Sequence, residues 1–325
     1  MTASDRSSRS GSSGEPATDL PTVVGAGLSG LVVSRALSRA GRPHYLIGPP
    51  PDSRPRLGES INLEGSIDLT ESWGGYAHRF YRKRSIVAFF AHHTAECNFE
   101  IARDRPSSIL FRLLGVRAPS EFLHVDRIGF DDDLFTDAVA APQCRHIPQT
   151  IASVDFDPAT DRVTGLSLAN GEILRPRFVF DATNHVRLLA RAAGLEIELL
   201  SEPQRVVYTH FETGDGAGAC PAAPWIHSTN LLRLYRDRDG VDGFAWVIPL
   251  GRAVSIGVNL DDRESRFGER DLLDRVERLF AARGLAYRSL YPEAGPVRSL
   301  RHQYFSHRRC AGANWLLVGP SSCQI

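Results

Sequence analysis

Three glycines at G-x-G-x-x-G spacing are the residues of this sequence best suited to binding phosphates. They stand in "TVVGAGLSGLVV", between a predicted strand and a predicted helix. In such a turn the first glycine allows a tight bend, the second lets the backbone approach a pyrophosphate, and the third lets helix and strand pack closely. The amides at the helix start favour negative charge. The spacing predicts a dinucleotide-phosphate site formed by Gly25, Ala26, Gly27, Leu28, Ser29 and Gly30.

The second predicted strand of this region ends at a glycine where an acid is expected. In dinucleotide-binding domains an acid about 20 residues after the glycines hydrogen-bonds a ribose hydroxyl. Here the strand ends "HYLIG", and Gly48 offers only its backbone. Loss of one charge-assisted hydrogen bond costs about 1.5–3 kcal/mol of affinity. The sequence therefore predicts weak dinucleotide binding, with Asp52 in the following loop as the alternative acid.

Hydrophobic periodicity predicts the elements that position these residues. Residues 20–48 indicate strand, turn, helix and strand, which is a βαβ unit. Residues 82–103 indicate an antiparallel strand pair. His92 and His93 are adjacent on one of these strands, so they are expected to point to opposite faces, one buried and one exposed, and not to form a metal site.

The rest of the chain is predicted to form a helix, a β-meander and a second set of strands. A helix is expected after Asp126, which would be its cap. The turn sequences "DPATD" and "ANGE" predict a β-meander that ends in a buried strand near residue 180. Residues 204–260 predict further strands, and an amphipathic helix is expected to end at Gly284.

Composition limits the partners and the compartment. Lys and Arg together number 38, as do Asp and Glu, so no summed charge favours nucleic acid or an anionic membrane. No apolar run approaches the roughly 20 residues of a membrane span, and no hydrophobic signal core is found near Met1. The five cysteines form no C-x-x-C. We therefore expect a cytoplasmic protein with a small-molecule substrate and no metal centre.

Four further stretches resemble the FAD-dependent superfamily of aromatic hydroxylases, flavin-dependent halogenases, geranylgeranyl reductases and lycopene cyclases. They are "RLGES", "HVDRIGFDDDL", "FVFDATN" and "NWLLVGPSSCQI". In the third, Asn184 replaces a family glycine, and Asn tolerates positive φ better than other non-glycine residues. In the fourth, Pro320 replaces the acid that binds the ribityl chain in the family. The resemblance implies FAD as cofactor, held additionally by Arg56, Glu59, Ser60, Arg127, Asp181, Gly319 and Pro320.

The resemblance also implies an α/β fold of the GR2 type, in which a Rossmann-like FAD-binding domain is interleaved with a mixed β-sheet substrate domain. Residues 1–19 are expected to be a disordered tail. The FAD-binding domain is predicted from 20–75, 125–200 and 298–325, and the substrate domain from 76–124 and 201–297. Relatives continue beyond the position of Ile325, so the resemblance also suggests a truncated or divergent member.

Two residues bear on the reaction, and each has an ordinary structural alternative. Trp246 lies in "GFAWVIPL", similar to the halogenase W-x-W-x-I-P; the alternative is a core strand with an aromatic face. Lys83 in "FYRKRSIVAFF" resembles the halogenase lysine that handles the active halogen; the alternative is a solvated basic strand end. By this resemblance Lys83 and Trp246 are the candidate catalytic residues.

The resulting prediction is an FAD-dependent oxidoreductase, a monooxygenase or halogenase, acting on a small apolar or aromatic metabolite. Only one dinucleotide fingerprint occurs, so electrons would come from NAD(P)H that binds transiently or from a separate flavin reductase. The alternatives are a redox-neutral flavin-dependent cyclase of the lycopene cyclase type and a truncated, non-catalytic family member.

Overall fold

The computed structural model describes residues 20–54, 56–99, 122–214, 223–264 and 266–324, so the predicted tail at 1–19 lies outside the described residues. The chain divides into two compact units. The first comprises the described parts of Met1–Pro50, Phe135–Glu198 and Ser306–Gln324, and the second those of Pro51–Leu134 and Leu199–Phe305. The domains predicted from sequence divide the chain elsewhere, chiefly by placing 51–75 and 125–134 with the first unit.

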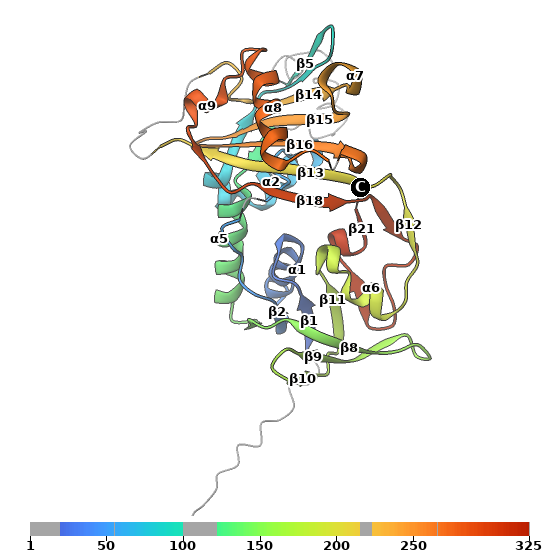
Figure 1. Cartoon of the computed structure of the whole chain (residues 1–325). Coiled ribbons are helices and arrows are strands. Elements are labelled where there is room, and N and C mark those ends of the chain that lie inside the picture. Colours follow the sequence, from blue (N-terminus) through green and yellow to red (C-terminus); the bar gives the residue numbers. More distant parts are fainter. Residues whose placement is uncertain (1–19, 55, 100–121, 215–222, 265, 325) are drawn as a thin grey trace, which may run out of the picture. The chain divides into compact units, whose positions relative to one another are not determined.

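A five-stranded parallel sheet forms the centre of the first unit (Figure 1). Its order is β20-β11-β1-β2-β7, and each neighbouring pair is parallel. Its strands consist largely of buried apolar residues, as expected for a parallel sheet covered on both faces. The bounds are β1 Pro21–Val24, β2 His44–Ile47, β7 Cys144–Ile147, β11 Phe178–Asp181 and β20 Trp315–Leu317.

Helix α1 (Leu28–Arg39) joins β1 to the parallel β2, which confirms the predicted βαβ unit. The predicted meander is the antiparallel sheet β8 (Ile151–Asp157), β9 (Arg162–Leu168) and β10 (Ile173–Leu174). Its buried side chains, among them Leu166, share one core cluster with Val179 and Trp315 of the parallel sheet. The short helix α6 (Leu188–Ala192) follows β11.

An eight-stranded mixed sheet forms the centre of the second unit, in the order β17-β13-β16-β15-β14-β4-β5 with β18 also paired to β13. The β14 and β4 strands are parallel, and the other pairs are antiparallel. The bounds are β4 Ser85–Phe89, β5 Thr94–Asn98, β13 Gln204–Glu212, β14 Ser228–Leu234, β15 Gly243–Leu250, β16 Ala253–Asp261, β17 Glu293–Ala294 and β18 Arg298–His302.

Strand alternation divides the side chains of this sheet between two faces. One face carries Val207, Val247 and Ile256, which share a core cluster with Leu272, Val276 and Phe280 of α8 (Glu269–Ala281). Gly284 follows α8 at φ +83°, as the predicted helix end requires. The opposite face carries Val206, Tyr208, Trp246, Ile248 and Leu250.

Most of the remaining elements are short, with the exception of helices α2 and α5. The second unit also contains the antiparallel pair β3 (Phe80–Lys83) and β6 (Phe122–Val125), and α5 (Arg127–Ala140) begins after Asp126, whose Oδ1 accepts the Gly129 amide at 3.0 Å. Strands β12 (Ile197–Leu199), β19 (Phe305–His307) and β21 (Cys323–Gln324) form a three-stranded sheet. The other helices and turns are α2 Leu63–Ser72, η1 Gly74–Arg79, η2 Asn184–Val186, α7 Arg236–Asp239, η3 Asp262–Glu264, α9 Tyr287–Leu290 and η4 Gly319–Ser321.

The predicted antiparallel pair is β4 and β5, but the placement of its two histidines was wrong. Phe89 pairs with Thr94, so residues 90–93 form the connecting turn rather than a strand. His92 and His93 are both exposed, and the ring of His93 stacks on that of Phe90 at 4.6 Å. The apolar residues after β4 continue past Phe89, where the hairpin pairing ends. The predicted strand was therefore too long, because hydrophobic periodicity does not mark the end of pairing.

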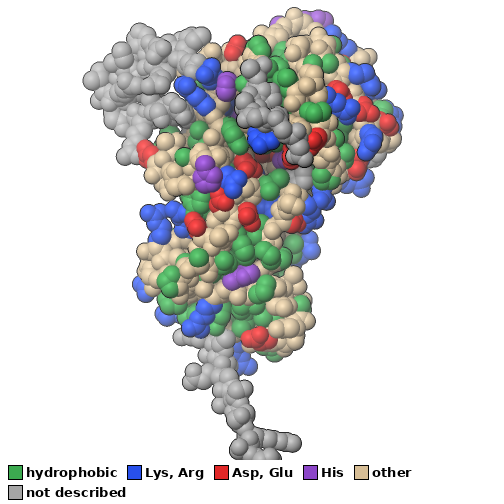
Figure 2. Space-filling model, turned by 90° about the vertical axis from the view of Figure 1, so that its left-hand side faces the viewer, with side chains coloured by type: hydrophobic (Ala, Val, Ile, Leu, Met, Phe, Trp, Pro, Cys, Tyr) green, Lys and Arg blue, Asp and Glu red, His purple; other side chains and the backbone are tan. Residues whose placement is uncertain are grey.

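Charged side chains of both signs are interspersed on the face of the molecule in Figure 2, in keeping with the equal numbers of basic and acidic residues. Among the helices of the described ranges, none is long and apolar enough to cross a membrane.

Candidate functional site

The turn between β1 and α1 has the geometry that a dinucleotide pyrophosphate requires. Gly25 has φ +107°, and a Cβ there would lie 2.4 Å from the Ala182 carbonyl oxygen. A Cβ on Gly30 would lie 1.8 Å from the Gly25 carbonyl oxygen. At Gly27, in contrast, a Cβ would meet nothing within 4 Å. Two glycines are therefore needed for packing, and the middle one leaves open space beside the backbone, as the approach of a pyrophosphate requires.

The start of α1 adds hydrogen-bond donors to this turn. The first amides of a helix have no intrahelical acceptor, and Gly27 provides no side-chain cap. These amides, together with the helix dipole, favour an anionic group. The residues present therefore fit a dinucleotide phosphate, and Ala26, Leu28 and Ser29 would supply backbone contacts to it.

Gly48 is required by the fold as a glycine. It has φ +146°, and a Cβ would lie 3.0 Å from the Ala26 amide nitrogen. His146 Nε2 donates a hydrogen bond to the Gly48 carbonyl at 2.9 Å. An acidic side chain at this position would thus be strained and would press on the phosphate-binding turn. The alternative acid, Asp52, belongs to the second unit, where hydrogen bonding from Arg54 lowers the pKa of its carboxyl.

Asp181 ties the end of β11 to the segments beside the fingerprint turn. Its buried carboxylate accepts hydrogen bonds from the Thr183 amide at 2.9 Å, the Thr183 hydroxyl at 2.6 Å, the Leu189 amide at 2.7 Å and the Ser321 hydroxyl at 3.3 Å. Four donors compensate the burial of this charge. Asp181 therefore supports the loop after β11, where Asn184 has φ +59°, as its tolerance of positive φ predicts.

The segment after β20 also lies against the start of α1. Gly319 has φ +58°, and a Cβ there would lie 2.3 Å from Ser29 Oγ. Pro320 stands in the first turn of η4, next to Ser321, which bonds to Asp181. The first unit thus brings together three of the sequence motifs: the glycine fingerprint, "DATN" and "VGPSS".

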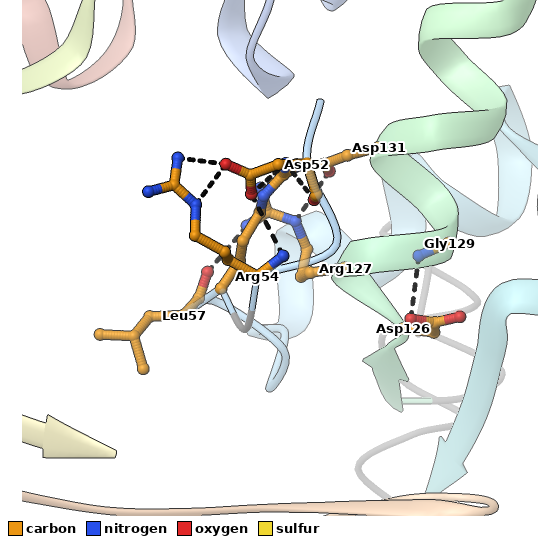
Figure 3. Close-up of polar contacts among 8 residues, drawn as sticks. Asp52, Arg54, Leu57, Asp126, Arg127, Gly129 and Asp131 are labelled. Carbon is orange, nitrogen blue, oxygen red and sulfur yellow. Dashed lines mark hydrogen bonds and ion pairs between the residues drawn. The ribbon is translucent and has the colours of Figure 1, made fainter. Parts of the chain in front are cut away.

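In the second unit, Arg56 and Arg127 both donate to Asp131, and we call these three residues the loop clamp. Figure 3 shows Arg127 and Asp131 at the start of α5. Arg56 donates to Asp131 Oδ2 at 2.7 Å, and Arg127 donates to both carboxylate oxygens at 3.1 Å. Arg127 also donates to the Leu57 carbonyl at 3.0 Å. Both guanidinium groups therefore attach the loop before Gly58 to α5. Asp131 was missed by the motif analysis, although it lies in the acidic run "FDDD".

The "GES" segment is fixed to one face of the large sheet by its two polar side chains. Glu59 is 2% exposed and accepts a hydrogen bond from His210 Nε2 at 2.9 Å. Ser60 lies 2.8 Å, Oγ to Oγ1, from Thr229. Burial, and then the charge of Glu59, raise the pKa of Tyr208, which remains a neutral phenol. His210 and Thr229 belong to strands that the sequence predicted but were not singled out, because nothing local marks them.

Lys83 is buried, with 3% of its surface exposed, so the solvated-strand-end alternative is wrong. Its Nζ donates to Ser60 Oγ at 3.1 Å and to the Ile61 carbonyl at 2.7 Å. Burial lowers the pKa of Lys83 to about 8. Lys83 is also the only lysine in the chain, since the other 37 of the 38 basic residues are arginines. A count of lysines would have singled it out from the sequence.

Trp246 is held within the second unit as a packed aromatic. It is 7% exposed, its ring lies over Gly257, and its Nε1 donates to Ser255 Oγ at 3.3 Å. It belongs to the core cluster with Tyr208 and Ile248. These contacts support the alternative interpretation of Trp246 as a residue of the core. Thr229 and His210 lie on the same face of the sheet as Trp246.

Comparison with solved structures shows which fold this is. The chain aligns over 95% of its length with the flavin-dependent brominase Bmp2, at 16% identity and a TM-score of 0.67, covering 73% of that chain. It aligns over 94% with a flavoprotein/dehydrogenase from Cytophaga hutchinsonii (19% identity, TM-score 0.69, 72% of that chain). It aligns over 95% with PqsL, named a "probable FAD-dependent monooxygenase", from Pseudomonas aeruginosa (16% identity, TM-score 0.67, 80% of that chain).

These similarities confirm the predicted α/β fold class and, at the level of the fold, the resemblance to flavin-dependent halogenases and monooxygenases. No protein-family model and no curated protein matches the sequence. The activity therefore has to be argued from the residues of this chain.

Proposed function

We propose that this protein is an FAD-dependent oxidoreductase. The observation that carries the proposal is the fingerprint turn, in which Gly27 faces open space before the uncapped start of α1, within a fold shared with flavin-dependent enzymes. Bound FAD would supply the redox chemistry, and NAD(P)H or a separate flavin reductase would supply electrons. The first-turn amides would hold the pyrophosphate, and Asp181 would keep the adjoining loop in place.

The reaction proposed is oxygen-dependent hydroxylation or halogenation of a small apolar or aromatic metabolite. This substrate class is proposed from the resemblance of the sequence motifs, because the apolar side chains of the large sheet, including Tyr208 and Ile248, are packed in a buried cluster. A flavin-dependent brominase and a probable FAD-dependent monooxygenase are among the structural neighbours.

Lys83 favours halogenation over hydroxylation. Three observations add to its resemblance to the halogenase lysine: Lys83 is buried, its pKa is lowered, and the sequence contains no other lysine. An arginine would remain protonated, whereas a buried amine can become neutral and handle an active halogen species. Lys83 is therefore the residue proposed to carry the halogen chemistry.

The experiment is product analysis by mass spectrometry with FAD, NAD(P)H, a flavin reductase and aromatic substrates, in chloride or bromide buffer. We expect Lys83→Ala to abolish halide incorporation while oxygen consumption by reduced flavin continues, and Lys83→Arg to give no rescue. Arg82→Ala, an exposed neighbour on the same strand, is the matched control and should retain incorporation. A hydroxylated product that survives Lys83→Ala would contradict halogenation and leave monooxygenation. Flavin binding without oxygen or NAD(P)H consumption would instead favour the redox-neutral cyclase.

A further inference from the structure

Lys83 is connected to a chain of polar side chains from three separate parts of the second unit, of which Thr229 and His124 are buried and Ser60 is half-buried. Ser60 precedes α2, Thr229 lies on β14, and His124 lies on β6; we call these three residues the hydroxyl chain. The distances are 3.1 Å from Lys83 Nζ to Ser60 Oγ, 2.8 Å from Ser60 Oγ to Thr229 Oγ1 and 2.9 Å from Thr229 Oγ1 to His124 Nε2. His124 Nδ1 lies 2.9 Å from the Pro249 carbonyl oxygen.

The Pro249 carbonyl fixes the direction of every hydrogen bond in this chain. A carbonyl only accepts, so His124 must carry its hydrogen on Nδ1, and Nε2 of the neutral ring must accept from the Thr229 hydroxyl. The Thr229 oxygen is then left to accept from the Ser60 hydroxyl, and the Ser60 oxygen to accept from Lys83. His124 is fully buried, and burial, with the nearby Lys83 charge, lowers its pKa to about 3. The ring therefore stays neutral and does not reverse the chain by taking up a proton.

The hydrogen bonds of Lys83 likewise fix the direction in which its amine lone pair points. One N–H is directed to Ser60 Oγ and a second to the Ile61 carbonyl. A neutral amine has only two hydrogens, so its lone pair must occupy the remaining tetrahedral direction. The rings of Phe99 and Phe122 lie beside the nitrogen, with centroids 5.9 and 5.6 Å away. Within the described part of the chain, no carboxylate forms an ion pair with Lys83.

We infer that the hydroxyl chain is a positioning device for Lys83, which keeps the amine lone pair turned away from Ser60 and available to an electrophile. This inference rests on the proposed function, in which the electrophile is an oxidised halogen species. Ser60, Thr229 and His124 act through Lys83 and are positioning residues. Without the chain, the Ser60 hydroxyl could rotate and donate to the amine lone pair, which would remove the nucleophile.

Because Lys83 is the only lysine, its titration can be followed without assignment. Incorporation of lysine labelled with ¹³C at Cε gives a single lysine signal for the whole protein, and its chemical shift against pH reports the pKa of Lys83. The ionisable groups near the chain are His124 and His227, with Arg82 and Arg84 on either side of Lys83 and Glu59, paired with His210, next to Ser60. All of these groups are present in every variant below, so their contributions cancel in the comparison.

The informative variant is Thr229→Val, which keeps the shape of the side chain and removes its hydroxyl. The freed Ser60 hydroxyl would then stabilise the neutral amine, and we expect the pKa of Lys83 to fall by about half a unit or more. Thr229→Ser should restore the wild-type value. Ser60→Ala removes an acceptor of the ammonium and should also lower the pKa, which provides a second test if Thr229→Val fails to fold. The matched control is Ser85→Ala, a buried serine that bonds to Ser228 and lies outside the chain.

An unchanged Lys83 pKa in Thr229→Val, or an equal fall in Ser85→Ala, would overturn the inference. A fall in Thr229→Val that Thr229→Ser reverses would support it, and we then expect halide incorporation to drop about tenfold in Thr229→Val while flavin reoxidation is unchanged. The NMR measurement needs neither flavin nor halide. If the wild-type protein gives no halogenated product, the proposed halogenation fails, while the titration still decides whether the chain positions the amine.

Discussion

Lys83 occupies a buried position in which a protonated amine is unfavourable, and this has a consequence for stability. Burial lowers the pKa of Lys83 from 10.5 to about 8. Between these two pH values the unfolded chain carries the proton and the folded chain does not. Stability contributed by this group therefore rises as pH increases through that window and is lowest below pH 8.

Replacing Lys83 by Met should remove this pH dependence, because Met has a similar length and does not titrate. We expect the free energy of unfolding of Lys83→Met, relative to that of wild type, to be about 3 kcal/mol larger at pH 7.5 than near pH 10.5, so that the variant is relatively more stable at the lower pH. Urea denaturation at a series of pH values measures the difference. Arg82→Met, at an exposed position on the same strand, should show a constant offset. A constant offset for Lys83→Met as well would show that the amine is not buried in the folded state.

At the scale of elements, the loop clamp holds the segment before Gly58 against the first turns of α5. Asp131 is 1% exposed and is the only carboxylate that the structure places on both Arg56 and Arg127 among the described residues. Removing one partner of a buried ion pair leaves the other charges without compensation. The clamp therefore sets the position from which the "GES" segment reaches the large sheet.

Asp131→Ala should destabilise the protein by about 3 kcal/mol, because two partly buried guanidinium groups lose their shared acceptor. Asp132→Ala is the matched control: it changes the neighbouring, exposed aspartate of the same run and should cost well under about 1 kcal/mol. Chemical denaturation of the two variants gives both values. Equal effects would mean that helix propensity or net charge, rather than the clamp, accounts for the loss.

The elements were predictable from the sequence because their signals are local. The glycine spacing, the Asp126 cap and the Gly284 helix end all act within a few residues. The contacts that make the candidate site are not local: Ser60 meets Thr229 across 169 positions and Glu59 meets His210 across 151. Gly48 shows the same limit. Position 48 is a glycine because Ala26 lies close to it in the folded turn, and the sequence alone does not show that contact.

At the scale of the whole molecule, each unit carries a different part of the proposed function. The first unit contains the dinucleotide turn with its supporting loops, and the second contains the buried amine and the aromatic sheet face. The proposal of FAD as cofactor rests on the glycine fingerprint of the first unit, on the resemblance of the sequence motifs and on a fold shared with flavin-dependent enzymes.

The most direct test of the proposed FAD-dependent function is FAD binding by the purified protein, measured by retained flavin absorbance after gel filtration with excess FAD and by the accompanying thermal shift. We predict that the wild-type protein retains FAD and that Gly27→Val abolishes retention, because the branched side chain would fill the space that the pyrophosphate needs. Gly74→Val is the matched control, since a Cβ at Gly74 also meets nothing within 4 Å, and it should bind as wild type does. A wild-type protein that retains no flavin and shows no thermal shift would contradict the account, and so would equal binding by Gly27→Val.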